Sequence, residues 1–371
     1  MSVSTQMQPK KLHVILRNDT GTLFAVMLYS LFKFTYNLLY TVQIIFVYNN
    51  YRFTDILLDV TSTKMNCVKF LQEVGIIASQ QQCPGPVIKG KRYGHCNHDM
   101  VVKDVKDRKD CLAWRCRKVH KVTDGLKTYV VKDVKVTIRK GSWIQHSNLT
   151  LEDIIKMIYL WANDYTTTQI CHELQMSQRT VIEWTQFLRE SCMAKMLDGS
   201  EQIGGENVEV EIDESKFGKR KYYKGKRVEG QWVFGGREKE NTSKVFMVPV
   251  HNRKRSTLIP LITKYIKKGS IIHSDCWKSY DCLGDMGYTH LTVNHSKTFK
   301  DEETGACTNK IESDWRHAKV SMPRYGVRQG KHASYLAEFM WRRKYADKDL
   351  FLCIIKDLNE HFTNKYFQST P

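Results

Sequence analysis

The sequence lacks the regular cysteine framework that holds small secreted domains together. Its 11 cysteines are odd in number and scattered over 371 residues. That pattern excludes a small disulfide-stapled scaffold and favours a reducing compartment. Internal repeats are missing as well, which excludes an architecture built from repeated units.

Acidic residues are few relative to basic ones. Lys and Arg number 58 against 39 Asp and Glu, which gives a formal net charge of +19 and a pI near 9.3. This surplus favours a polyanionic partner; nucleic acid is the first candidate, and a membrane surface is the alternative. A chain of this length has room for two or three domains.

Charged residues are almost absent from one N-terminal stretch. Between Thr22 and Tyr48 the only charged side chain is Lys33, and the stretch is long enough to cross a bilayer. It does not resemble a signal peptide, because no small-residue cleavage site follows it. A membrane span is disfavoured because Lys33 lies mid-stretch. We therefore predict an apolar leader of unassigned role over residues 1–62; a helical appendage and a membrane anchor are the alternatives.

The rest of the chain changes character along its length. Residues 67–140 carry five cysteines among Gly, Pro and short β-branched runs such as 134–138, which predicts small strands and knuckles. Residues 149–192 switch to helical spacing. From 206 to 345, strands come first and then alternate with helices, which predicts a mixed sheet with helices packed on it. Residues 346–371 are expected to form a C-terminal tail.

Three carboxylates stand out in the predicted sheet region. Asp213 and Asp275 each end an apolar strand pattern, and ligand sites of open sheets lie at such ends. Glu312 falls in a predicted helix beside the stripe formed by Ile311 and Trp315, so it can reach the other two. Three converging carboxylates suit a pair of Mg²⁺ ions, which take oxygen ligands and support in-line displacement at phosphate.

Each of these carboxylates also has an ordinary interpretation. An Asp at a strand end is commonly a turn former or a helix cap, and a helical Glu is commonly a solvated surface residue. Glu209, Glu211 and Glu214 are local rivals of Asp213, and the first two share its side of the strand. The pattern leaves these rivals open, although the order strand end, strand end and helix face on a basic chain favours the triad.

Five motifs in order give a resemblance to a known family. They are Val210–Phe217, Trp232–Gly236, Ser274–Tyr280, Val293–Ser296 and Thr308–Glu312. Over residues 67–345 the chain resembles the Merlin superfamily of DDE transposases and related bacterial insertion-sequence transposases with an ISXO2-like catalytic domain. The resemblance implies a ribonuclease H-like core, cut-and-paste DNA transposition, and Mg²⁺ or Mn²⁺ as cofactor. It makes Asp213 the first catalytic Asp, Asp275 the second, and Glu312 the third acidic residue, with the same three as metal ligands.

Four residues near the triad have candidate roles. Asn309 lies one helical turn before Glu312, where it can orient a carboxylate or a ligand water, or simply cap the helix. His295 can contact a phosphate near the metals, or it is structural. Trp277 and Trp315 are expected in the core.

Two segments are candidate DNA contacts. The run from Lys216 to Arg227 has no acidic residue, so it is expected to meet phosphates; a solvated charged face is the alternative. Its proposed contacts are Lys219, Arg220, Lys221 and Lys224. The block 149–192 is predicted to be a helix-turn-helix, with Gln178 and Arg179 on a recognition helix; a helical hairpin used only for packing is the alternative.

The cysteine region departs from the family pattern. The relatives resemble a zinc ribbon with a Cys-Pro-x-Cys knuckle, but here the motif beginning at Cys83 lacks its second cysteine. A closed zinc site needs four N or S ligands. Cys83, Cys96, Cys116 and His120 are the candidates, and a degenerate ribbon without metal is the alternative.

Together these observations predict an α/β chain: a ribonuclease H-like mixed sheet with flanking helices, preceded by a helix-turn-helix and a degenerate zinc-ribbon-like region. The expected function is metal-dependent cleavage at element ends and strand transfer into target DNA. Expected partners are the terminal inverted repeats, target DNA and further copies of the chain on DNA, in the nucleus, with a membrane role disfavoured. The alternative is a domesticated, catalytically silent DNA-binding protein that keeps the fold.

Overall fold

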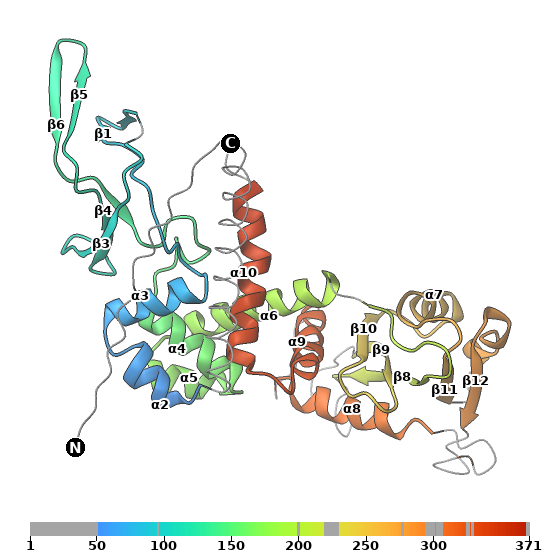
Figure 1. Cartoon of the computed structure of the whole chain (residues 1–371). Helices are drawn as coiled ribbons and strands as arrows, with labels where there is room; N and C mark the ends of the chain where they lie inside the picture. Colours follow the sequence, from blue (N-terminus) through green and yellow to red (C-terminus); the bar gives the residue numbers. More distant parts are fainter. Residues whose placement is uncertain are drawn as a thin grey trace, which may run out of the picture. The chain divides into compact units, whose positions relative to one another are not determined.

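The computed structural model describes residues 51–94, 96–198, 201–218, 230–275, 278–293, 301, 307–323, 327 and 330–368 (Figure 1). Most of the leader expected over residues 1–62 therefore lies outside the described residues. Among the helices in the described ranges, none combines the length and apolar character that crossing a membrane requires.

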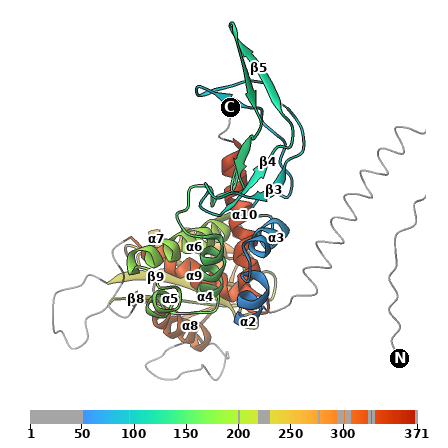
Figure 2. The ribbon, with the colours of Figure 1, turned by 90° about the vertical axis from the view of Figure 1, so that its left-hand side faces the viewer.

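One core is shared by helices from both ends of the described chain. They are α2 (Phe53–Asp55), the π-helical turn η1 (Ile56–Val60), α3 (Lys64–Glu73), α4 (Leu151–Ala162), α5 (Thr167–Leu174), α6 (Gln178–Asp198) and α10 (Leu350–Gln368). The hydroxyls of Thr63, Thr150 and Thr166 cap α3, α4 and α5 by accepting backbone N–H groups. Helix α4 buries almost its whole length, including Ile154 and Ile158, among the other helices. Figures 1 and 2 show α10 alongside α4 and α6.

Three of the expected boundaries differ from the structure. The proposed leader ends too late, because Ile56 is fully buried in the helical core and Phe53 stacks on Tyr159. The proposed tail is α10, whose apolar side chains recur at helical spacing and pack into the same core. Its buried residues are Phe351, Ile354, Ile355 and Leu358. The second helix of the expected helix-turn-helix also continues beyond residue 192, to Asp198.

Short strands fill the segment between α3 and α4. They are β1 (Val87–Ile88), β2 (Lys91–Arg92), β3 (Val101–Asp104), β4 (Leu112–Arg115), β5 (His120–Asp124), β6 (Lys127–Val131) and β7 (Lys135–Thr137). Strands β3, β4 and β7 form an antiparallel sheet, while β1–β2 and β5–β6 are hairpins. The small strands expected over residues 67–140 are thus present in the described structure.

A five-stranded mixed sheet makes up the second half of the described chain. Its elements are β8 (Glu209–Phe217), β9 (Gln231–Glu238), β10 (Val245–Val250), α7 (Arg255–Tyr265), β11 (Ile271–Asp275), the 3₁₀ turns η3 (Lys278–Tyr280) and η4 (Gly284–Met286), β12 (Thr289–Val293), α8 (Asn309–Val320) and α9 (His332–Lys344). The strand order is β10-β9-β8-β11-β12. The pairs β10–β9 and β9–β8 are antiparallel, and β8–β11 and β11–β12 are parallel. The mixed sheet predicted for residues 206–345 is confirmed.

Two apolar layers cover this sheet, one on each face. Because side chains alternate between the two faces along β8, Val210 and Ile212 pack in the layer that contains α7. Phe217 packs in the layer that contains α8 and α9. Figure 1 shows α7 and α8 on either side of the strands. The side chain of a β8 residue therefore faces α7 or α8 according to its position in the strand.

Candidate active site and cysteine cluster

The first two carboxylates of the triad lie on neighbouring parallel strands. In the β8–β11 pairing, Ile271 is opposite Glu209 and His273 is opposite Glu211. The same register, continued two residues further, brings Asp275 opposite Asp213. Register partners in parallel strands point to the same face, so the two side chains share one side of the sheet.

The third carboxylate comes from α8, which packs on that face. Glu312 lies in the first turn of the helix and is exposed, whereas its neighbour Ile311 is fully buried. The Thr308 hydroxyl donates a hydrogen bond to Glu312 Oε1 at 3.3 Å. The helix thus anchors itself through Ile311 and leaves the Glu312 carboxylate open to solvent.

The negative charges of Asp275 and Glu312 act on the Asp213 carboxylate. Burial is the main cause that raises the pKa of Asp213 to about 6, and the negative charges of Asp275 and Glu312 contribute in the same direction. Hydrogen bonds from Trp315 Nε1 at 2.9 Å and from the Glu214 backbone N–H at 2.7 Å act in the opposite direction. Such mutual repulsion between carboxylates is what a bound cation relieves.

Trp315 does more than fill the core as expected. Its indole N–H donates to Asp213, while its ring packs where a Cβ at Gly235 would come within 2.5 Å of it. Gly235 is directly opposite Asp213 in the β8–β9 pairing. A glycine inside a strand signals such a close approach, so the motif Trp232–Gly236 contained this information.

The rival carboxylates have other partners. Glu209 pairs with Lys239, at 2.5 Å. Glu211 is fully buried and accepts backbone N–H groups at the start of α8. Burial raises its pKa, against the lowering effect of those hydrogen bonds.

Glu214 points to the opposite side of β8 from Asp213. It accepts a hydrogen bond from the Tyr280 hydroxyl and lies 3.7 Å from an Arg253 nitrogen. Burial, followed by the charges of Asp213 and Asp275, raises the pKa of Glu214 to about 8. Tyr280 is itself fully buried, so this pair ties the turn after β11 to β8.

Comparison with known proteins gives one family. Residues 196–344 match the family described as the ISXO2-like transposase domain. The chain is 32% identical over 116 residues to an uncharacterized transposase-like protein of Haemophilus influenzae, a match that spans 31% of this chain and 93% of the relative. The chain belongs to this transposase family. The resemblance to DDE transposases drawn from the five motifs is confirmed.

Among solved structures, the crystal structure of a pre-cleavage Mos1 transpososome shares 11% identity with this transposase. The match covers 53% of this chain and 78% of that chain. Its TM-score is 0.17, which is too low for the similarity to bear on the fold.

The structure describes only some of the other site residues expected from the sequence. Asn309 is exposed as the first residue of α8, and Thr308 rather than Asn309 is the cap residue. Other expected residues lie outside the described residues: His295, Trp277, Lys219, Arg220, Lys221 and Lys224.

Helices α5 and α6 pack together in the transposase as two consecutive helices joined by a tight turn. Gln175 ends α5 in the left-handed conformation, with φ of 51°, and the Ser177 hydroxyl accepts the Thr180 backbone N–H at 3.2 Å. Gln178 and Arg179 are exposed at the start of α6. The Arg179 guanidinium pairs with Glu183 one turn later, at 2.9 Å.

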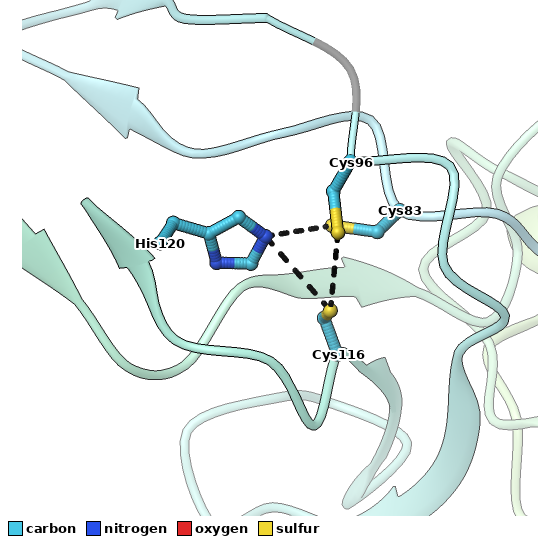
Figure 3. Close-up of side chains that lie close together, drawn as sticks. All are labelled: Cys83, Cys96, Cys116 and His120. Carbon is cyan, nitrogen blue, oxygen red and sulfur yellow. Dashed lines mark hydrogen bonds between the residues drawn. The ribbon is translucent and has the colours of Figure 1, made fainter. Parts of the chain in front are cut away.

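The four proposed zinc ligands converge (Figure 3). Cys83 precedes β1, Cys96 follows β2, Cys116 follows β4, and His120 begins β5. Their sulfur and ring nitrogen atoms all lie within 4.8 Å of one another. The Cys83 sulfur is 3.5 Å from His120 Nε2, and the Cys96 and Cys116 sulfurs are 4.0 Å apart.

The truncated knuckle at Cys83 has a conformation of its own. Gly85 has φ of +85°, and a Cβ there would lie 2.0 Å from the Gly94 carbonyl oxygen. Cys96 follows two residues after Gly94, so this close approach brings Cys96 back towards Cys83. Burial raises the pKa of the Cys83 thiol to about 11, and the Gly85 backbone N–H bonded to the sulfur acts in the opposite direction.

Proposed function

We propose that this transposase is a metal-dependent enzyme that cleaves DNA at element ends and joins the freed 3′ end to target DNA. The observation that carries the proposal is that Asp213 and Asp275 lie on neighbouring parallel strands, on the face of the sheet that α8 covers with Glu312 in its first turn. Carboxylate oxygens are the ligands that Mg²⁺ and Mn²⁺ prefer. The fold we propose for this half is ribonuclease H-like, supported by two antiparallel and two parallel strand pairs in the order β10-β9-β8-β11-β12.

Each residue of the site has a distinct part in this mechanism. Asp213 and Asp275 would hold the cations against the sheet, and the exposed Glu312 would complete the ligand set from the helix. Bound as a pair, the cations would activate the attacking oxygen and stabilise the leaving oxygen of an in-line displacement. Trp315 orients Asp213 through its indole N–H, and Tyr280 and Glu214 hold the turn that follows Asp275.

DNA recognition is proposed for α5 and α6, as a helix-turn-helix. Support comes from the capped turn between them and from Gln178 and Arg179, exposed at the first turn of α6, where recognition helices contact base edges. The basic run that includes Lys219, Arg220, Lys221 and Lys224 is proposed to bind phosphates near the metals. We further propose that copies of the chain assemble on the element ends and that the protein acts in the nucleus, where such DNA lies.

A structural zinc ion is proposed at Cys83, Cys96, Cys116 and His120. In a tetrahedral site with Zn–S of about 2.3 Å and Zn–N of about 2.0 Å, neighbouring ligand atoms lie about 3.5 to 3.8 Å apart. The separations of 3.5 Å, 3.9 Å and 4.0 Å in the cluster fit that geometry. The ion would tie the loops around β1–β2 to the base of the β5–β6 hairpin.

The test is Asp275→Asn in the full chain. We expect Mn²⁺-dependent nicking of a plasmid that carries the inverted repeats flanking the gene to fall by at least about a thousandfold, because loss of a cation ligand removes most transition-state stabilisation. Binding of the same DNA in a gel-shift assay should stay within about twofold, since Asp275 is expected to bind cation rather than DNA. Nicking that survives the substitution would contradict the triad, and DNA binding without nicking by the wild type would favour the catalytically silent alternative.

A further inference from the structure

The carboxylate of Glu211 contacts the first turn of α8. A single oxygen, Oε2, accepts the backbone N–H groups of Lys310 and Ile311, each at 2.9 Å. Its other oxygen lies 3.7 Å from the sulfur of Cys307. The side chain is fully buried, so water does not compete for these contacts.

These contacts meet a need of the helix. The first N–H groups of an α-helix have no partner within the helix, and a carboxylate at that end also complements the helix dipole. Hydrogen bonds to an ionised acceptor in a buried place are among the stronger ones in proteins. Glu211 therefore fixes the height at which α8 begins over the sheet.

The position of Glu211 links this anchor to the metal site. Glu211 and Asp213 lie on the same side of β8, two residues or roughly 7 Å apart. Ile311, which donates to Glu211, directly precedes Glu312. One strand therefore carries both the first carboxylate and the anchor of the helix that carries the third.

We propose that Glu211 is a positioning residue that sets Glu312 at the distance from Asp213 needed for cation binding. The proposal rests on the proposed function of the triad. Supporting groups of this kind typically change metal affinity by about 10- to 100-fold when they are altered. In this role the side chain must present an oxygen that accepts hydrogen bonds, and that oxygen must lie as far from the β8 backbone as a glutamate places it.

The rest of α8 is held independently. Asp314, which is fully buried, pairs with Arg237 at 3.0 Å and with Arg343 at 2.5 Å. Trp315 packs against Gly235. A change at Glu211 should therefore shift the start of the helix and leave the helix itself in place.

Two substitutions separate position from charge. Glu211→Gln keeps the length and a carbonyl oxygen that can accept both N–H groups, but it removes the charge. Glu211→Asp keeps the charge and shortens the reach by one methylene. The matched control is Glu209→Gln, on the same side of β8, where the carboxylate pairs with Lys239.

The experiment is a titration of the full-length chain with Mn²⁺, with free Mn²⁺ followed by electron paramagnetic resonance. We expect Glu211→Asp to raise the half-saturating Mn²⁺ concentration by about tenfold or more, Glu211→Gln by no more than about threefold, and Glu209→Gln not at all. Thermal unfolding of each variant checks that the fold is kept.

Two results would overturn the inference alone: Glu211→Asp binding Mn²⁺ like the wild type, or Glu211→Gln losing at least as much affinity as Glu211→Asp. In both cases the wild type would still bind Mn²⁺, and Asp275→Asn would abolish that binding. If the wild type shows no such binding, the proposed function fails, and this inference fails with it.

Discussion

The carboxylate site and the cysteine cluster gather their side chains in opposite ways. Asp213 and Asp275 project from the centre of a five-stranded sheet, whose packing holds them together despite their repulsion. Cys83, Cys96 and Cys116 come from loops near strands of two to four residues, and His120 begins a strand of five. The comparison teaches that a large sheet can hold candidate metal ligands through its own packing, whereas ligands in loops between short strands depend more on the ion proposed to bind there.

The largest expected effect is loss of zinc. Cys116→Ser should remove bound zinc and expose residues 83–137 to protease, because structural zinc supplies much of the folding free energy of such small units. Atomic absorption measures the zinc content, and limited proteolysis measures the exposure of residues 83–137. Cys111→Ser, outside the cluster but in the same region, is the control and should keep both properties. Equal protease resistance of the wild type and Cys116→Ser would contradict the proposal that a metal ion stabilises the short strands of this region.

The next effect concerns the buried Asp213 carboxylate, whose charge is disfavoured by burial and, to a lesser extent, by Asp275 and Glu312. Its folded pKa is raised to about 6 from a usual value of 3.8, so its stabilising contribution is complete below pH 3.8 and is lost as pH rises through 6. That shift corresponds to about 3 kcal/mol of the free energy of unfolding. Urea unfolding with chelator at pH 4.5 and pH 7 should show the loss, and Asp213→Asn should reduce it. Identical pH dependence in both proteins would show that folding does not raise the pKa of Asp213.

A smaller effect is expected from crowding the indole that orients Asp213. Gly235→Ala places a Cβ 2.5 Å from the Trp315 ring, and overpacking of this kind costs about 1 to 3 kcal/mol of the free energy of unfolding. Plasmid nicking should fall with it, since Trp315 must move away from Asp213. Gly284→Ala is the control, because a Cβ there meets open space. Similar denaturant midpoints and nicking rates for the two variants would argue against the packing role of Gly235.

The smallest effect is expected at the start of α6. Arg179→Ala should weaken binding to the cognate terminal repeat by about 1 to 2 kcal/mol and binding to random duplex hardly at all, because a side chain that reads a base edge acts on specificity. The lower part of the usual range is expected because the Arg179–Glu183 pair must open first. Fluorescence anisotropy on both DNAs at two salt concentrations measures it. Equal weakening on both would move repeat recognition to the cysteine region.

The elements, and the strand or helix that carries each triad residue, could be predicted because local patterns encode them. Helical spacing placed Ile311 and Glu312 on adjacent faces of α8, and Asp275 ends β11 as expected. The expected strand end at Asp213 was wrong, because β8 continues to Phe217 and Asp213 lies in the middle of the strand. The alternating pattern indicated the face of β8 correctly, but not where the strand ends. The role of Glu211 could not be predicted in this way. Its position on the same side of the strand made Glu211 a rival of Asp213 as a metal ligand. Only the tertiary contact with the start of α8 indicates that it anchors the helix instead.

The boundaries failed for a similar reason. Residues 346–371 follow the last family motif, so the motifs do not indicate which helices the amphipathic helix in this segment packs against. Its partner surface is provided by α4 and α6, some 150 to 200 positions earlier in the chain. Long-range packing of this kind is visible only once both surfaces are folded.

The return of α10 has a consequence for how the protein is made. The core around α4 includes Phe351, which stacks on Phe70 at 5.9 Å, and Ile354 and Leu358, both fully buried. During synthesis the ribosome releases these residues after the five strands of the sheet, so the helical core stays incomplete while those strands are already available to pair. A nonsense change after residue 345 would spare every residue of the proposed active site and still leave the helices before it without part of their core.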